Sequence, residues 1–218
     1  MTPELLLRRF GFVPIRLPDT KRLFDLVLIL VGLPVWLPLI LIIALAARVL
    51  QGPGVFFAQQ RVGRGGRMFR MWKFRTMVPG AEGQLPRLLM EEGRGREWAR
   101  LTKLVDDPRV TAWGRMLRRF SLDELPQIWN VLCGEMSLVG PRPVPRAEFG
   151  ARYDAPTARA YCAHRPGMSG LWQVSGRNAL SYEERLRLDR RYDRTRSLGG
   201  DAVILLRTLG VVLGGRGT

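Results

Sequence analysis

Residues 26–47 read LVLILVGLPVWLPLILIIALAA, a run of 22 residues without a charged side chain. At about 1.5 Å per residue, a straight helix of this length would extend roughly 33 Å, and the hydrocarbon core of a bilayer is about 30 Å thick. A signal peptide fits poorly, because the run is too long, starts well inside the chain and precedes no small-residue cleavage site. The sequence therefore predicts a membrane segment.

Two prolines, Pro34 and Pro38, interrupt the middle of this segment. In a continuous helix they cannot donate to the carbonyls of Leu30 and Pro34, and each ring clashes with the carbonyl four residues earlier. Such a pair favours a sharp kink. The freed carbonyls then need partners from the protein, because lipid offers none.

Basic residues flank the apolar run on both sides, whereas a spanning helix normally has one cation-rich, cytoplasmic side. This favours a re-entrant helix-break-helix over residues 21–50, with legs that each reach roughly 15 Å into one leaflet. A simple spanning helix and the core helix of a soluble protein are the alternatives. Asp25 is expected at the interface, near Lys21 or Arg22. The flanking cations are Arg8, Arg9, Arg16, Lys21 and Arg22 before the run, and Arg48, Arg61, Arg64, Arg67, Arg70, Lys73 and Arg75 after it.

The charge balance indicates an anionic partner. The 218 residues include 35 Lys+Arg and 19 Asp+Glu, which gives a formal net charge of +16. Nearly all the basic residues are arginines, whose planar forks suit phosphate oxygens, although codon bias alone can produce this preference. Nucleic acid, an anionic membrane face and phosphorylated substrates are the classes of partner that such a charge favours.

Cysteine and histidine usage excludes several kinds of site. Cys133, Cys162 and His164 are the only such residues, so a zinc site is not expected, and no disulfide framework can form. A reducing, cytoplasmic setting is therefore the default. The chain contains neither a GxSxG nucleophile elbow nor a GxxxxGK[ST] phosphate loop.

The rest of the chain predicts an α+β, mainly helical domain. Val55–Val62 and Met68–Phe74 read as strands joined by a glycine-rich turn, so a cationic β-hairpin is expected. A capping box at Ser181 opens a helix. Further helices are expected at 113–120 and 202–213. No linker divides the chain, which gives an amphipathic, basic segment (1–20), the membrane segment (21–50) and a cytoplasmic catalytic domain (51–218).

An acidic pair, Asp123 and Glu124, follows Ser121. Ser121-x-x-Glu124 reads as a second capping box, with Asp123 at the positive end of a helix. Pro126 disfavours a long regular helix that starts at Ser121, so a later start or a local kink stays open.

The same pair can also carry chemistry, because Arg118 and Arg142 lie close in sequence. A carboxylate can attack phosphorus and form an acyl phosphate. A Mg²⁺ ion held by a carboxylate and by phosphate oxygens would screen the anionic substrate. Arginine forks stabilise charge on the equatorial oxygens. From these residues alone, either carboxylate can be the nucleophile and the other the metal ligand.

The run SLDELPQIWNVL (121–132), followed by GEMSLVGPRP (134–143), resembles the signature of the bacterial sugar transferases, which are monotopic polyprenyl-phosphate phosphoglycosyl transferases. Further blocks agree in the same order, and the similarity covers roughly residues 20–214. These blocks are KRLFD (21–25), GPGVFF (52–57), KFRTM (73–77), PGMSG (166–170) and GRNAL (176–180).

This resemblance implies a re-entrant helix and a cytoplasmic catalytic domain at the inner membrane, with both termini cytoplasmic. It also implies transfer of a sugar-1-phosphate from a UDP-sugar to undecaprenyl phosphate, with release of UMP, as the first membrane step of surface glycan assembly. The membrane and the two substrates are then the partners, downstream glycosyltransferases are candidate partners, and nucleic acid is not a partner.

By the same resemblance, the path is ping-pong: Asp123 attacks the sugar-linked phosphorus and Glu124 holds Mg²⁺. Many members of the family break the re-entrant helix with Ser-Pro, whereas this chain has Leu37-Pro38. The serine hydroxyl that could satisfy a freed carbonyl is therefore missing. The implied substrate-binding residues are Lys73, Arg75, Arg118, Arg142, Arg177, Asn178 and Asp189.

Two other interpretations compete with the transferase. A membrane-anchored basic protein could bind nucleic acid or anionic lipid, with Trp72, Trp113, Trp129 and Trp172 as stacking or interface residues. A spanning-helix scaffold would have one periplasmic terminus. The transferase explains the membrane segment, the cationic surface and the acidic pair together, because a lipid phosphate and a nucleotide sugar must meet at one interface.

Overall fold

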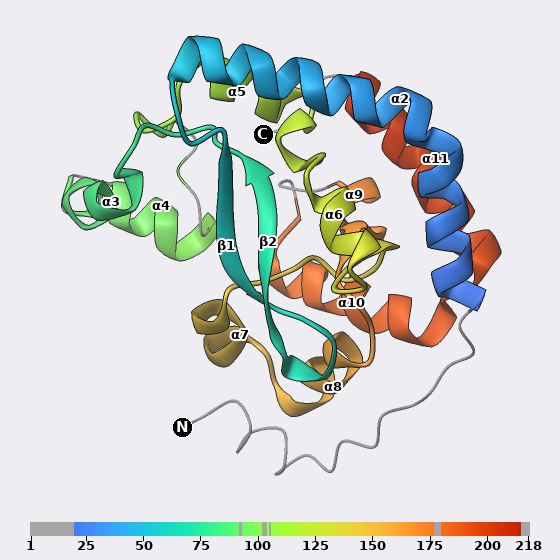
Figure 1. Ribbon diagram of the computed structural model, residues 1–218. Coiled ribbons are helices and arrows are strands. Elements are labelled where there is room, and N and C mark those ends of the chain that lie inside the picture. Colours follow the sequence, from blue (N-terminus) through green and yellow to red (C-terminus); the bar gives the residue numbers. More distant parts are fainter. Residues whose placement is uncertain (1–19, 92, 102–103, 105, 177–179, 215–218) are drawn as a thin grey trace.

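A computed structural model describes residues 20–91, 93–101, 104, 106–176 and 180–214 (Figure 1). It confirms a mainly helical α+β fold, with one long helix, α2 (Thr20–Gln51), against small helices and two short sheets. The strands are β1 (Phe56–Val62), β2 (Met68–Phe74), β3 (Ser137–Val139) and β4 (Gly167–Ser169), and the 3₁₀ turns are η1 (Arg64–Gly66) and η2 (Leu122–Glu124). The other helices are α3 (Ala81–Leu89), α4 (Arg94–Leu101), α5 (Ala112–Arg119), α6 (Gln127–Leu132), α7 (Arg146–Arg152), α8 (Ala155–Cys162), α9 (Leu171–Val174), α10 (Tyr182–Thr195) and α11 (Leu198–Leu213).

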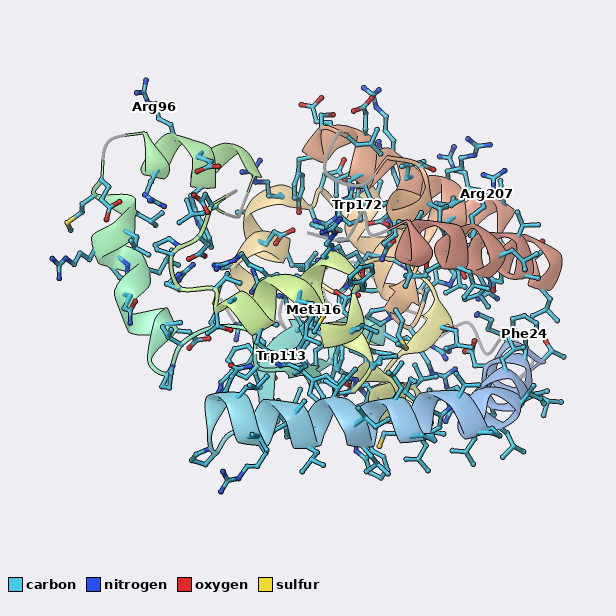
Figure 2. All side chains as sticks on the ribbon, turned by 90° about the horizontal axis from the view of Figure 1, so that it is seen from above. Phe24, Arg96, Trp113, Met116, Trp172 and Arg207 are labelled. Atoms are coloured by element: carbon cyan, nitrogen blue, oxygen red, sulfur yellow. The ribbon has the colours of Figure 1, made fainter. Side chains whose placement is uncertain are left out.

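Helix α2 is continuous through Pro34 and Pro38, so the predicted break between two helices is a bend within one helix. Figure 2 looks down its first part, near Phe24, while its second part runs across the view. The indole Nε1 of Trp36 donates to the carbonyl oxygen of Ile29 at 2.8 Å. The indole thus reaches a backbone carbonyl five residues before Pro34, which is not one of the carbonyls of Leu30 and Pro34 that the prolines leave without a helical donor.

One face of α2 is apolar and open, and the other is packed. Val31 and Val35 are each 72% exposed. Ile29 is buried with Ile128 and Val131, which form part of α6. Within the described residues, α2 is the one helix long and apolar enough to cross a membrane.

A buried ionic group fixes the start of α2. The Nζ of Lys21 lies 2.9 Å from Oδ1 of Asp25 and 3.0 Å from Oδ2 of Asp201, which belongs to α11. The Ser137 hydroxyl donates to Asp25 at 2.7 Å, and the Tyr192 hydroxyl donates to Asp201 at 3.0 Å. The expected place of Asp25 beside Lys21 is confirmed, and the group joins α2 to β3, α10 and α11.

The predicted hairpin is confirmed, with β1 and β2 antiparallel from the pair Phe56–Phe74 to the pair Val62–Met68. Gly65 and Gly66 have positive φ angles of 66° and 74°, a conformation that glycine adopts without a steric penalty. Phe69 of β2 is buried in the same cluster as Ile29 of α2. The hairpin therefore packs against the long helix.

The second sheet is a parallel pair of β3 and β4 that sits next to α11. A Cβ on Gly167 would lie 2.1 Å from the backbone nitrogen of Gly140, so the close approach of these two loops requires glycine. The predicted capping box at Ser181 is present at the start of α10, with both reciprocal hydrogen bonds. The expected helices near 113–120 and 202–213 are α5 and α11.

Replacing Trp36 with Phe should destabilise the bend. Phe keeps an aromatic ring but removes the indole donor to the Ile29 carbonyl, and the loss of one such hydrogen bond costs about 0.5–1.5 kcal/mol. Denaturant unfolding in mild detergent measures the free energy of unfolding. The matched control is Trp129→Phe, because the Trp129 side chain is 62% exposed. Equal losses in both variants would contradict a role for the indole hydrogen bond.

Candidate active site

The acidic pair lies in η2, between α5 and α6, rather than in the first turn of a regular helix. Ser121 has a φ of 55° and makes no capping hydrogen bond, so the capping box predicted there is wrong. Helix α6 starts later, at Gln127, directly after Pro126. Ser121 is the only described non-glycine residue with a positive φ, a conformation that costs about 1–2 kcal/mol. The strained turn presents both carboxylates from one short 3₁₀ segment.

Two leucines attach this turn to the long helix. Leu122 and Leu125, on either side of the acidic pair, pack against a cluster that contains Ile43 of α2 and Phe74 of β2. Trp113 of α5 joins the same cluster, and Figure 2 shows it on the side of α5 toward α2. The acidic pair is therefore supported directly by the second part of the apolar helix.

Lys73, near the end of β2, lies between the two carboxylates. Its Nζ donates to Oε1 of Glu124 at 2.8 Å and lies 3.6 Å from Oδ2 of Asp123. Burial is the largest influence on Asp123 and raises its pKa, and the neighbouring charge of Glu124 acts in the same direction. The charges of Lys73 and Arg118 oppose this rise. Asp123 is thus a buried carboxylate of raised basicity, held beside an ammonium group.

Arg118 forms the third side of this site. Its Nε donates to the Thr76 hydroxyl at 3.0 Å. Burial lowers the pKa of Arg118, while the carboxylates of Asp123 and Asp107 raise it. The sequence did not single out Thr76 as a site residue. The available signal was the position of Thr76, three residues after Lys73 and just beyond the end of β2.

Arg142 and Asp189 lie in a second polar cluster. The guanidinium carbons of Arg142 and Arg185 lie 5.0 and 5.3 Å from the ring centroid of Trp172. Asp189, one helical turn after Arg185, is 3% exposed, and burial raises its pKa to about 7 against the charge of Arg185. Asp189 Oδ2 and the Nε and Nη2 atoms of Arg185 are buried without a hydrogen-bond partner in the part of the chain that the structure describes. Buried polar atoms without partners are uncommon in proteins, which makes this cluster a candidate binding site.

The predicted site residues thus fall into different places. Lys73 and Arg118 surround Asp123 and Glu124, whereas Arg142 and Asp189 belong to the cluster around Trp172. Arg75 points elsewhere: its two terminal nitrogens donate to the carbonyls of Pro53 and Gln51, both at 2.6 Å, and brace the loop after α2. Arg177 and Asn178 lie outside the described residues.

Sequence reasoning missed two members of the second cluster, Arg185 and Trp172. Arg185 lies four residues before Asp189 on a helix that the capping box at Ser181 had already predicted, so its place on the same face could have been inferred. Trp172 carried no such local signal. Its contacts with Arg142 and Arg185 join three separate segments of the chain.

The donor set fits a Mg²⁺ ion that arrives with a substrate. Among the described residues, no group of three or more His, Cys, Asp or Glu side chains could hold a metal. Mg²⁺ usually binds one or two carboxylates and completes its shell with water and substrate phosphates. The adjacent carboxylates of Asp123 and Glu124 meet that requirement, but they do not form an all-protein metal cage.

Comparison with known proteins identifies the class of this site. The model of the family described as "Bacterial sugar transferase" matches residues 17–215, and the chain belongs to this family, as its motifs predicted.

Curated relatives agree with this assignment. The "UDP-galactose-lipid carrier transferase" of Erwinia amylovora is 48% identical over 195 residues, which are 88% of this chain and 40% of the relative. The "Undecaprenyl-phosphate galactose phosphotransferase" of Salmonella typhimurium is 43% identical over 194 residues, again 88% and 40%. The exopolysaccharide production protein ExoY of Sinorhizobium fredii is 40% identical over 200 residues, 91% of this chain and 88% of the relative. The chain therefore spans about two fifths of the first two relatives and most of the third.

The Asp123 carboxylate should titrate above the range of an ordinary aspartate, because burial and Glu124 outweigh Lys73 and Arg118. Replacing Lys73 with Met removes the nearest positive charge and should raise the pKa of Asp123 further. Carboxyl ¹³C shifts of labelled aspartate against pH measure this. The control is Arg70→Met, an exposed position on the same strand. An ordinary pKa in the wild type, or no change on loss of Lys73, would contradict the assigned electrostatics.

Proposed function

We propose that this chain transfers a sugar-1-phosphate from a UDP-sugar to undecaprenyl phosphate and releases UMP. Membership of the family supports the reaction class, and the name of the Salmonella relative supports the lipid acceptor. The observation that carries the proposal is the buried Asp123 beside Lys73 and Glu124, seated on the apolar helix α2. A lipid phosphate and a soluble nucleotide can both reach a site at such a boundary.

In the first step, a carboxylate oxygen of Asp123 attacks the sugar-linked phosphorus of the UDP-sugar. A new O–P bond forms, the bond to the uridine-linked phosphate breaks, and UMP leaves with the electron pair. The raised pKa makes this carboxylate more nucleophilic when ionised, and Lys73 helps to keep it ionised. The product is an aspartyl phosphosugar.

In the second step, a phosphate oxygen of undecaprenyl phosphate attacks the same phosphorus. The bond from phosphorus to Asp123 breaks, which restores the carboxylate and leaves the sugar on a lipid diphosphate. Arg118 lies on the side of the site where its guanidinium can stabilise charge on the phosphoryl oxygens. The two attacks on one phosphorus make the path ping-pong.

Glu124 and the substrate phosphates would hold Mg²⁺. An ion bound there would neutralise part of the negative charge on the diphosphate of the UDP-sugar. Because Lys73 already donates to Glu124, this ammonium orients the Glu124 carboxylate. The cluster of Arg142, Arg185, Asp189 and Trp172 is the place for the remaining polar part of the donor, since it holds unsatisfied buried donors and an acceptor.

The proposal places α2 in the cytoplasmic leaflet of the inner membrane as a re-entrant helix, with both termini in the cytoplasm. The bend at Pro34 and Pro38 and the cationic flanks support this topology.

Replacing Asp123 with Asn should lower the rate of UMP release by at least about 10³-fold and abolish the labelled covalent adduct, because the amide is a poor nucleophile. The assay uses undecaprenyl phosphate and a panel of UDP-sugars, so it also identifies the donor. Asp106→Asn, on an exposed loop, is the matched control. Turnover near the wild-type rate in the Asp123 variant would remove Asp123 as the nucleophile.

Replacing both Pro34 and Pro38 with Ala should straighten α2 into a spanning helix, because the two missing N–H donors and the ring clashes are removed. Single cysteines placed at each terminus report topology through a membrane-impermeant thiol reagent in intact cells. Both termini should be protected in the wild type, and one should become accessible in the double variant. Pro53→Ala, beyond the end of α2, is the control. Unchanged accessibility in the double variant would refute the re-entrant arrangement.

A further inference from the structure

A cationic pocket lies at the start of α2, where Leu23 is already 63% exposed and the apolar surface begins. It is a small, open-mouthed pocket with a cavity volume of about 40 Å³, room for about three water molecules. Elements far apart in sequence line it: α2, η1, β3, the end of α8 and the end of α10. Its basic side chains are Lys21, Arg22, Arg64, His164, Arg165 and Arg196.

This pocket is separate from the acidic pair. Arg64 belongs to the turn of the hairpin, whereas Lys73 lies near the far end of β2. At about 3.3 Å per residue, the strand carries these two positions roughly 20 Å apart. The charges that act on Asp123 are those of Lys73, Glu124 and Arg118, and none of them lines the pocket.

Backbone contacts hold two of the arginines in place. Arg22 donates to the carbonyls of Val131 and Leu132 at the end of α6. Arg165 donates through Nε to the carbonyl of Gly134 at 2.9 Å. Within the described part of the chain, the two terminal nitrogens of Arg165 make no hydrogen bond. The guanidinium of Arg165 is therefore held in place through Nε, while its two terminal nitrogens are available to a ligand.

Arg196 is held at the pocket by a hydrogen bond to His164. Its Nη1 donates to Nδ1 of His164 at 3.2 Å, and His164 Nε2 in turn donates to Asp193 at 2.7 Å. Burial lowers the pKa of His164 and outweighs the hydrogen bond to Asp193, which raises it, so the neutral ring is favoured. A neutral histidine leaves the guanidinium groups as the charged donors of the pocket.

Among the described residues, the pocket lining contains six basic side chains and no carboxylate. Lys21 already contacts both Asp25 and Asp201. Among the described residues, Asp193 is then the one carboxylate in contact with the His164–Arg196 pair, while Arg22, Arg64, Arg165 and Arg196 all line the same space. The open terminal nitrogens of Arg165, with the guanidinium groups of Arg22 and Arg196 beside them, match the oxygens of a phosphate, which arginine binds through paired hydrogen bonds.

We propose that this pocket binds a phosphate group, carried either by an anionic phospholipid headgroup or by a soluble phosphate ester. The proposal does not depend on the sugar transfer proposed above. A bound phosphate would neutralise the arginines and link the start of α2 to α6, α8 and α10. The two sources of the phosphate group are distinguished by which probe binds, phosphatidylglycerol or inorganic phosphate.

The test uses the full chain in a zwitterionic detergent, with Arg165→Gln and Arg196→Gln as pocket variants. Arg191→Gln is the matched control, because it removes the same charge from an exposed position of α10. Inorganic phosphate is titrated by ³¹P NMR. Retention of phosphatidylglycerol against phosphatidylcholine is measured by native mass spectrometry. The wild type and the control should bind phosphate or retain phosphatidylglycerol, and each pocket variant should bind at least tenfold more weakly.

Preferential retention of phosphatidylglycerol assigns the pocket to a lipid headgroup, and binding of inorganic phosphate alone assigns it to a soluble ester. Equal binding by the pocket variants, the control and the wild type would overturn the proposal, and so would no binding of either probe to the wild type. Melting temperatures without ligand establish that the variants fold, and Arg196→Lys, which keeps the charge, should recover part of the binding. UMP release is assayed separately, so failure here is distinct from failure of the proposed transferase.

Discussion

The position of Lys21 between the carboxylates of Asp25 and Asp201 determines how the long helix meets the rest of the protein. Both carboxylates are almost completely buried, and breaking a buried pair typically costs about 3–5 kcal/mol. The start of α2 is therefore fixed against β3, α10 and α11. With that end fixed, the bend brings Ile43 against Leu122 and supports the acidic pair.

The candidate site contains two separate groups of charged residues, one around Asp123 and one around Trp172. Burial makes Asp123 more basic, while Lys73 and Arg118 favour its charged form. Around Trp172, two stacked guanidinium groups and the buried Asp189 leave polar atoms unsatisfied. Trp172, which the nucleic-acid interpretation used for stacking, instead lies beside the guanidinium groups of Arg142 and Arg185.

Local patterns were sufficient for much of the fold: glycines predicted the hairpin turn, and Ser181 with Glu184 predicted the start of α10. The same pattern failed at Ser121, because tertiary packing of Leu122 and Leu125 holds a 3₁₀ turn where a helix start was expected. The family motif located Asp123 and Glu124, but contacts between distant segments decided the partners of Arg75 and Trp36. No rule of sequence spacing predicts the hydrogen bond from Arg75 to the carbonyl of Gln51. The same is true of the hydrogen bond from the Trp36 indole to the carbonyl of Ile29, seven residues earlier.

The scarcity of lysine has a practical consequence. The chain has three lysines, Lys21, Lys73 and Lys103, and the first two hold the carboxylates of the helix anchor and of the acidic pair. Their side chains are 17% and 21% exposed, so both are partly shielded from solvent. Acylation of primary amines therefore provides a footprint with very few signals: protection at Lys73 reports occupancy beside Asp123, and protection at Lys21 reports an intact junction between α2 and the domain.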